Sequence, residues 1–294
     1  MFATSESLET LRQQYKASLQ QFNHSSKSFQ LVDTITLREP SRVAPQTALY
    51  VLDSSFNPPT VVHTSIAASA LRSARNRYGA SGRLLLLLAT QNADKPSKPA
   101  SFEARLVMMR LLAQDLLETL DENSANQTDL AAGTAIDIGI TKQPYFVDKA
   151  ISIANDNGDI YPKDLVQTHL IGYDTLVRIF DPKYYPPDHN LNVLEPFLSQ
   201  HKLSVTLRVD TTWGGREEQL SFLTELGSGA MERIGGKREW VDRIEVAERG
   251  DAGEPVSSTR ARDSARTGNT LLLQTLVTPR VQQYIMSQDL YKDS

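Results

Sequence analysis

The chain has 294 residues, of which 40% are hydrophobic and 22% charged, and its formal net charge is -4 at pH 7. This length and composition predict a globular protein with a substantial core, either one large α/β domain or a domain with a small appendage. The acidic balance argues against binding of a long nucleic acid but is compatible with a local basic pocket for one nucleotide. The absence of cysteine excludes a disulfide framework, a thiolate zinc site and a cysteine nucleophile.

No membrane-spanning segment is predicted, because the longest apolar run, residues 84–89, is far too short to cross a bilayer. The first residues lack a signal-like apolar core, and Glu6 and Glu9 weigh against a transit peptide. We therefore expect a cytoplasmic or nuclear protein, or one present in both compartments.

Residues 1–45 are predicted to form an N-terminal amphipathic helix and a lead-in segment. Between residues 5 and 23, apolar side chains recur at three- and four-residue spacing, which is typical of one face of a helix. Residues 29–37 follow as a short strand or a loop, and Ala44-Pro45-Gln46 breaks the chain before the first strong strand. The remainder, residues 46–294, is predicted to be a single domain.

From residue 48 onward, apolar runs alternate with helical patterns, which predicts parallel βαβ units. Strands are expected at residues 48–53, 84–90, 135–140, 168–172 and 203–209, and helices at residues 64–77, 101–120, 146–155 and 217–226. Residues 122–133, 181–192 and 227–236 are expected to be loops. The expected fold is α/β, with a mostly parallel sheet of five to six strands and helices on both faces. In such a sheet ligands lie beyond the carboxyl ends of the strands.

A polar motif directly follows the first of these strands: Ser54-Ser55-Phe56-Asn57-Pro58-Pro59-Thr60-Val61-Val62-His63. Two prolines fix φ within a tight turn, and a helical pattern begins where the turn ends. Thr60 and His63 therefore stand beside free helix N–H groups, where anions bind. A histidine near a helix start is also common as a cap or a surface residue, so this motif alone leaves both interpretations open.

A second motif, Val256-Ser257-Ser258-Thr259-Arg260-Ala261-Arg262, opens a helical segment near the end of the chain. Hydroxyl side chains at a helix start either cap the helix or join its N–H groups in binding phosphate oxygens. Arg262 lies one turn further on the same side of the helix.

Together the two motifs resemble the signatures of the nucleotidyltransferase superfamily, most closely those of nicotinamide and nicotinate mononucleotide adenylyltransferases of the divergent fungal branch. The first is similar to Gly-Ser/Thr-Phe-Asn/Asp-Pro-x-Thr/His-x-x-His and matches at six positions: Ser55, Phe56, Asn57, Pro58, Thr60 and His63. Ser54 departs from it, because the family has a glycine there that lets the backbone approach phosphate. The second motif is similar to Ile-Ser-Ser-Thr-x-x-Arg.

Weaker similarities lie between these signatures. Residues 92–105 resemble a family segment in which a lysine meets the substrate phosphate, a role that falls to Lys95 or Lys98. Asp148 matches a Val-Asp-x segment, but the tryptophan that stacks on the pyridine ring in many relatives is missing after it. Gly172 and Asp174 match Ile-Gly-x-Asp, and Tyr184 or Tyr185 stands where relatives place a stacking aromatic ring.

The resemblance implies a Rossmann-like nucleotidyltransferase fold and an enzyme that transfers AMP from ATP to nicotinamide or nicotinate mononucleotide, releasing pyrophosphate and yielding NAD or its deamido precursor. Mg²⁺ would be held through the ATP phosphates rather than by the chain. The implied catalytic residues are His63, Thr60 and Arg262. The implied ATP-binding residues are Ser54, Ser55, Phe56, Asn57, His63, Gly172, Asp174, Ser258, Thr259 and Arg262. The implied acceptor-binding residues are Phe56, Lys95, Asp148 and Tyr185.

Two alternatives stay open at this stage. One is a related nucleotidyltransferase or a nucleotide hydrolase with another substrate, which the missing tryptophan allows. The other is an ATP-binding regulatory protein with weak catalysis, in which Ser54 is the damaged position. The expected partners are ATP and a mononucleotide, without a long nucleic acid or a membrane, and the oligomeric state is left open.

Overall fold

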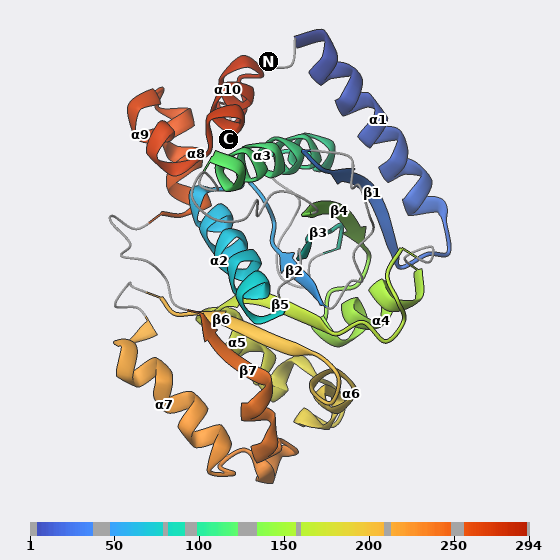
Figure 1. The fold of residues 1–294 in the computed structure, drawn as a ribbon, viewed down its shortest axis with the longest axis vertical. Helices are drawn as coiled ribbons and strands as arrows, with labels where there is room; N and C mark the ends of the chain where they lie inside the picture. The colour runs from blue at the N-terminus through green and yellow to red at the C-terminus, as the bar shows by residue number, and fades with distance from the viewer. Residues whose placement is uncertain are drawn as a thin grey trace.

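The computed structural model describes residues 5–37, 48–78, 82–91, 99–122, 134–156, 160–208, 213–247 and 256–292. Within these ranges the strands form one seven-stranded sheet in the order β1-β4-β3-β2-β5-β6-β7 (Figure 1). Six strands run parallel: β2 (Leu49–Asp53), β3 (Arg83–Ala89), β4 (Ala135–Thr141), β5 (Gln167–Gly172), β6 (Lys202–Thr206) and β7 (Ile244–Ala247). β1 (Phe29–Ile35) pairs antiparallel with β4 at one edge. The predicted α/β class is confirmed, but the sheet has seven strands rather than five to six.

The two additional strands lie at the edges of the sheet, where sequence patterns are weak. β1 is the segment that the sequence left open between a strand and a loop, and its two ends, Phe29 and Ile35, are buried. β7 has only four residues and directly follows the 3-10 helix η5 (Arg238–Arg243). A run this short carries too little alternation to be distinguished from a loop.

Helices cover both faces of the sheet (Figure 1). One face carries α1 (Ser5–His24), α2 (Val61–Tyr78), α3 (Phe102–Glu122), α8 (Ser258–Arg266), α9 (Thr270–Leu276) and α10 (Pro279–Ser287). The other carries α4 (Phe146–Asp156), α5 (Tyr173–Ile179), α6 (Glu195–Leu198) and α7 (Arg216–Gly227). The predicted helices at residues 64–77, 101–120, 146–155 and 217–226 correspond to α2, α3, α4 and α7.

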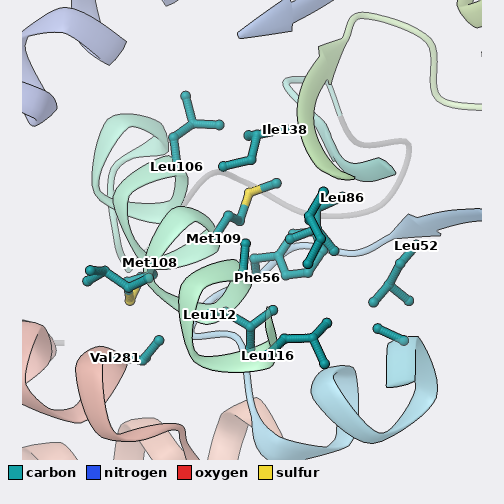
Figure 2. Packing of buried hydrophobic residues seen from close by; sticks show 14 of the residues in the cluster. Leu52, Phe56, Leu86, Leu106, Met108, Met109, Leu112, Leu116, Ile138 and Val281 are labelled. Carbon is teal, nitrogen blue, oxygen red and sulfur yellow. The ribbon is translucent and has the colours of Figure 1, made fainter. Parts of the chain in front are cut away.

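β3 shows how the sheet holds the two layers together. Leu84, Leu86 and Leu88 point into the larger cluster under α3, whereas Leu85 and Leu87 point into the cluster on the opposite face. Alternation along a strand thus feeds both cores, which is why β3 reads as one continuous apolar run. Figure 2 shows α3 packed on this sheet face, and Met109 and Leu112 of α3 belong to the same buried cluster as Leu86.

The N-terminal segment shares the main core. Tyr15, Leu19 and Phe22 of α1 belong to the same buried cluster as α3, and β1 extends the same sheet. The division of the chain at residue 46 stays a prediction. No helix in the described part of the chain is long and apolar enough to cross a membrane.

The predicted loops are partly structured. Residues 181–192 contain the 3-10 helix η1 (Pro182–Tyr184) and lead into η2 (Leu191–Leu194). Residues 227–236 contain η4 (Glu232–Ile234), flanked by Gly229 and Gly235 at positive φ. Residues 123–133 of the third predicted loop lie outside the described residues.

Candidate active site

A cavity of about 290 Å³ opens where β2, β5 and β6 end. β2 lies between β3 and β5, so the chain leaves it toward β3 on one side and later returns on the other side to form β5. In open α/β sheets, the crevice at such a reversal of strand order is the usual ligand site. Gly172 lines the cavity together with the polar residues Asp53, Ser54, Thr60, His63, Asp174, Thr175, Thr206, Arg208, Ser257 and Ser258.

A larger cavity of about 840 Å³ lies between α1, β1 and α3, with Tyr15, Asp33 and Arg110 in its wall. Its charged groups are already paired, since Asp33 accepts hydrogen bonds from both Tyr15 and Arg110. Because none of the predicted site residues line it, the smaller cavity is the candidate active site.

His63 both caps α2 and faces this cavity. Thr60 directly precedes the helix, and its backbone N–H donates to His63 Nδ1 over 3.0 Å. In a capping box, the side chain at the third helical position accepts a hydrogen bond from the backbone N–H of the residue before the helix, and that side chain is usually a glutamate. Here His63 takes this role. His63 can therefore cap the helix and face an anion in the cavity at the same time, so the two interpretations of the motif do not exclude each other.

The hydrogen bonds of His63 fix its tautomer. Nδ1 accepts from the Thr60 N–H, so the ring proton belongs on Nε2, which lies 3.0 Å from Ser54 Oγ. Burial lowers the pKa of His63 to about 4. The imidazole is therefore neutral at physiological pH and acts as a donor through Nε2.

The two sequence signatures meet at the cavity although they lie about 200 residues apart. Ser258 Oγ donates to the carbonyl oxygen of Pro58 over 2.8 Å. Arg262 Nη1 donates to the carbonyl oxygen of Asn57 over 2.7 Å, and its Nη2 donates to Thr259 Oγ1 over 3.0 Å. The neighbouring Ser257 caps α8 by accepting from the backbone N–H of Arg260. The start of α8 is thus bonded directly to the first βα turn.

Phe56, which is predicted to bind ATP and the acceptor, turns its side chain into the core. Its side chain is completely buried in the core cluster beneath the turn, with its ring centroid 5.3 Å from that of His63 (Figure 2). Its backbone φ is +45°, a conformation that a bulky residue rarely adopts. The apolar ring is drawn into the core, so Phe56 supports the turn and the underside of His63 rather than lining the cavity.

Tyr291, which the sequence did not single out, ties the C-terminus to the same turn. Its hydroxyl donates to Asn57 Oδ1 over 3.0 Å, and both residues are buried. The buried Arg105 of α3 lies near this pair, with its Nε donating to the Ala100 carbonyl oxygen and its pKa lowered by burial. Only the C-terminal position of Tyr291 is visible in the sequence, and position alone does not indicate such a contact.

Gly172 and Asp174 lie where the resemblance placed them, at the carboxyl end of β5. A Cβ on Gly172 would come within 2.7 Å of Asp174 Oδ1, so the glycine leaves room for that carboxylate. Asp174 in turn accepts from Arg208 Nε over 2.9 Å and pairs with its Nη2 over 2.8 Å. Arg208 was not predicted, although an arginine near the carboxyl end of a strand is the signal that could have indicated it.

The predicted acceptor residues are only partly brought to the cavity. Tyr185 Oη donates to the Ile179 carbonyl oxygen, and its ring packs against Tyr145 with centroids 6.3 Å apart. Asp148 is half-buried on α4, next to Lys149. Neither Asp148 nor Tyr185 is among the residues that line the cavity. Ser55 is exposed in the turn, and the predicted Lys95 lies outside the described residues.

Lys149 is a buried cation that sequence reasoning missed. Its ammonium pairs with the carboxylate of Asp53, the residue that directly precedes Ser54, and lies 5.2 Å from the centre of the Phe146 ring. Lys149 is 5% exposed. The ion pair therefore places a charged group of α4 immediately beside the first motif.

The described residues contain no group of three or more His, Asp or Glu side chains that could hold a metal ion. Both carboxylates at the cavity already pair with cations, Asp53 with Lys149 and Asp174 with Arg208. This donor set fits a Mg²⁺ ion bound mainly by phosphate oxygens better than one bound by the chain.

The parallel sheet, the crevice at its reversal of strand order and the donors around a helix start are the features with which α/β proteins bind ligands that carry phosphate. No protein-family model matches the chain. A protein of Schizosaccharomyces pombe named "Putative nicotinamide mononucleotide adenylyltransferase" is 33% identical over 257 residues, which cover 87% of this chain and 88% of the relative. The chain belongs to the nicotinamide mononucleotide adenylyltransferase family.

Two solved structures are also similar to the chain. The nicotinic acid mononucleotide adenylyltransferase of Plasmodium falciparum, complexed with APC, has a TM-score of 0.49 and 10% identity, over 85% of this chain and 99% of that one. A structure from Vibrio parahaemolyticus, described as a "Putative Nicotinate-nucleotide Adenylyltransferase", has a TM-score of 0.36 and 12% identity, over 85% of this chain and 98% of that one. The family assignment rests on the S. pombe relative.

Proposed function

We propose that this chain is an adenylyltransferase of NAD biosynthesis, which transfers AMP from ATP to nicotinamide mononucleotide or its nicotinate counterpart and releases pyrophosphate. The observation that carries this proposal is the direct bonding of the two signatures at one cavity, by Ser258 to Pro58 and by Arg262 to Asn57. The bonding brings hydroxyls of both signatures, the neutral imidazole of His63 and two helix starts to one space, and it holds Arg262 on the turn beside that space.

The chemistry needs no nucleophile from the enzyme. A phosphate oxygen of the acceptor attacks the α-phosphorus of ATP, and the bond from that phosphorus to the bridging oxygen of pyrophosphate breaks. Catalysis then consists of positioning and of stabilising charge on the transferring phosphorus and on the leaving group. Donors fixed in place before the reaction supply this at little reorganisation cost.

The proposed roles follow the two helix starts. We place the α-phosphate beside His63 and Thr60, at the start of α2, where the Nε2 proton of His63 is donated to Ser54 Oγ at the cavity wall. Ser258, Thr259 and Arg262, at the start of α8, hold the β- and γ-phosphates of the leaving group. Arg262 is suited to this because its guanidinium is already anchored on Asn57 and Thr259, which reduces the entropy lost on binding.

Mg²⁺ is proposed to enter with ATP, bound to the phosphate oxygens, where it supplies neutralising charge. On the acceptor side we propose Asp148 and Tyr185 near the mononucleotide, with Lys95 on its phosphate and the Lys149–Asp53 pair beside it. We also propose a cytoplasmic or nuclear location. The net charge of -4 supports single nucleotides, rather than a long nucleic acid, as the partners.

The test is incubation of the full chain with ATP, Mg²⁺ and a panel of mononucleotides, with dinucleotide and pyrophosphate measured together. Dinucleotide and pyrophosphate in equal amounts, with a pyridine mononucleotide as the preferred acceptor, are expected. AMP without dinucleotide would indicate a hydrolase instead. ATP binding without product from any acceptor would indicate a regulatory protein, and either result would overturn the proposal.

A further inference from the structure

Ser54 stands at the exit of β2, between the sheet and the cavity. Its backbone N–H donates to the Leu87 carbonyl oxygen over 3.3 Å, extending the β2–β3 pairing by one residue. Its side chain lines the cavity, with Oγ 3.0 Å from His63 Nε2. Where the nucleotidyltransferase signature that the motif resembles has glycine, this chain therefore has a hydroxyl in contact with the imidazole.

The direction of the hydrogen bonds around His63 leaves the hydroxyl hydrogen of Ser54 free to be donated to a ligand. Nδ1 accepts from the Thr60 N–H, so the only ring proton of the neutral imidazole is on Nε2 and is donated to Ser54 Oγ. The hydroxyl accepts this bond and keeps its own hydrogen. Within the described part of the chain, Ser54 Oγ makes no hydrogen bond other than that with His63.

We propose that Ser54 is a phosphate-contacting residue, whose hydroxyl donates to an anionic oxygen of the bound nucleotide while it accepts the Nε2 proton of His63. This proposal rests on the proposed function, because it identifies the donor that meets the phosphate in the same site. Donation by the imidazole polarises the hydroxyl and strengthens its bond to the anion. His63 thus acts on the phosphate through Ser54.

In the competing arrangement Ser54 obstructs the site, because its hydroxyl accepts the Nε2 proton that His63 would otherwise donate to phosphate. In that case the phosphate must first break the bond between Ser54 and Nε2. In the proposed arrangement the bond between His63 and Ser54 is kept, and the Ser54 hydroxyl donates to the phosphate in addition. The two arrangements predict opposite signs for removal of the hydroxyl.

The kinetic test compares Ser54→Ala and Ser54→Gly with the unchanged chain. A hydrogen bond to a charged oxygen contributes enough that both variants should lose about ten- to a hundredfold in kcat/KM for ATP. Ser65→Ala serves as the matched control, since Ser65 is exposed on α2 and does not line the cavity. Activity of both Ser54 variants equal to or above that of the unchanged chain would overturn the proposal.

An NMR measurement separates this role from a merely structural one. In protein labelled with ¹⁵N-histidine, the Nε2 proton of His63 should give an exchange-protected signal that Ser54→Ala abolishes, with the fold retained by circular dichroism. On addition of a non-hydrolysable ATP analogue to the unchanged chain, this proton should stay bonded to Ser54. A change of its bonding partner to phosphate would overturn the proposal.

Calorimetric titration with the same analogue keeps the two proposals distinguishable. If the unchanged chain makes no dinucleotide, the proposed function fails, yet a loss of about tenfold in analogue affinity in Ser54→Ala would still support the contact. If the chain is active and both Ser54 variants bind the analogue and turn over normally, the Ser54 contact fails and the proposed function stands.

Discussion

At the scale of single residues, the site depends on side chains whose positions are fixed before a nucleotide arrives. His63 is held through Nδ1 by Thr60 and through Nε2 by Ser54, and the turn in front of it is held by Ser258 and Arg262. Phe56, at a φ of +45°, persists in this rare conformation because it is buried completely. Strain of this kind is common where backbone geometry serves ligand binding.

The first prediction concerns His63. His63→Ala should lower kcat by about 10²- to 10⁴-fold, because it removes the imidazole whose Nε2 proton polarises the hydroxyl that meets the transferring phosphate. ATP affinity, measured by calorimetry, should fall much less, since the contacts of α8 remain. Near-normal turnover in this variant would remove His63 from the mechanism.

Tyr291 carries the second prediction. Tyr291→Phe deletes the hydroxyl that orients Asn57 and should lower kcat about three- to tenfold, with a drop of only a few degrees in the unfolding midpoint. Tyr284→Phe is the matched control, because the buried Tyr284 hydroxyl has no hydrogen-bond partner within the described residues. The account is contradicted if the two variants have equal activity.

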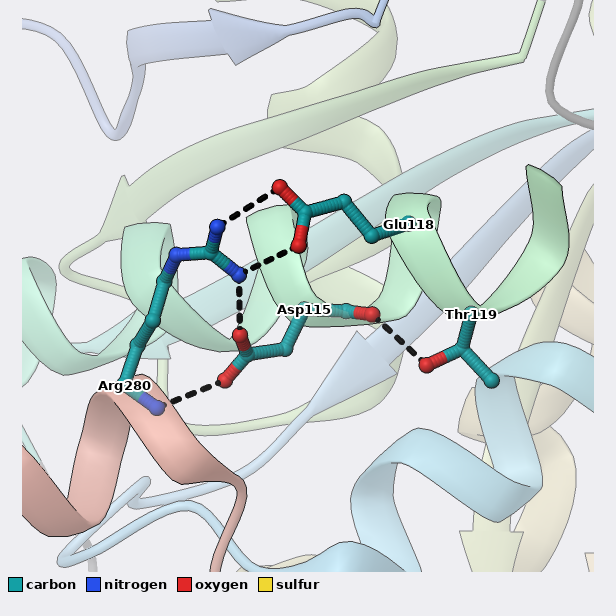
Figure 3. A network of polar contacts seen from close by, with 4 residues as sticks. All are labelled: Asp115, Glu118, Thr119 and Arg280. Atoms are coloured by element: carbon teal, nitrogen blue, oxygen red, sulfur yellow. Dashed lines mark hydrogen bonds and ion pairs between the residues drawn. The ribbon is translucent and has the colours of Figure 1, made fainter. Parts of the chain in front are cut away.

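At the scale of elements, the C-terminal helices have to stay docked on α3 for α8 to reach the first turn. Figure 3 shows the polar connection: the Arg280 guanidinium bonds both oxygens of Glu118, at 2.7 and 2.6 Å, and also pairs with Asp115. The backbone N–H of Arg280 donates to Asp115 Oδ2 over 3.1 Å, so this carboxylate also caps the start of α10.

The third prediction follows from this connection. Arg280→Ala should destabilise the fold by about 2 kcal/mol, because Asp115 is left buried without its cation. This loss is smaller than that expected for a fully buried ion pair, because Glu118 is half exposed. Denaturant unfolding measures the change. Arg238→Ala, which breaks the exposed pair with Glu232, should leave the midpoint unchanged. Equal effects of the two variants would contradict this docking role.

What the sequence could predict differs between local and tertiary features. The two motifs, their helices and the parallel sheet are visible because they depend on residues within about ten positions of each other. Tyr291 with Asn57 and Lys149 with Asp53 are contacts between distant segments, and no local pattern encodes them. For Phe56, the motif match indicates that the residue is required but does not show whether its side chain faces the ligand or the core, where the structure places it.

At the scale of the whole molecule, three histidines with lowered pKa values make stability depend on pH: His169 and His201 are buried, and His63 is half-buried. Burial lowers the pKa of His63 and of His201 to about 4 and lowers that of His169 as well. The unfolded chain therefore binds protons more readily than the folded one below pH 6.5, so stability is complete above that pH and falls as the pH drops toward 4.

The fourth prediction is a loss of roughly 1–2 kcal/mol at pH 5 for each of His63 and His201, relative to pH 7.5. Calorimetric unfolding across this range measures it. His201→Asn should flatten the profile, because its side-chain oxygen can accept the Gln167 N–H that His201 Nδ1 accepts and does not titrate. A stability that does not change between pH 7.5 and 5 would contradict the neutral state of these rings in the folded chain.

The central claim is that the cavity joining the two signatures transfers AMP, and isotope tracing tests it most directly. With Mg²⁺ and nicotinamide or nicotinate mononucleotide, ATP labelled with ³²P at the α-position should pass its label to the dinucleotide, and ATP labelled at the γ-position should pass its label to pyrophosphate. Label from the γ-position in inorganic phosphate, or label from the α-position in free AMP with none in a dinucleotide, would contradict the claim.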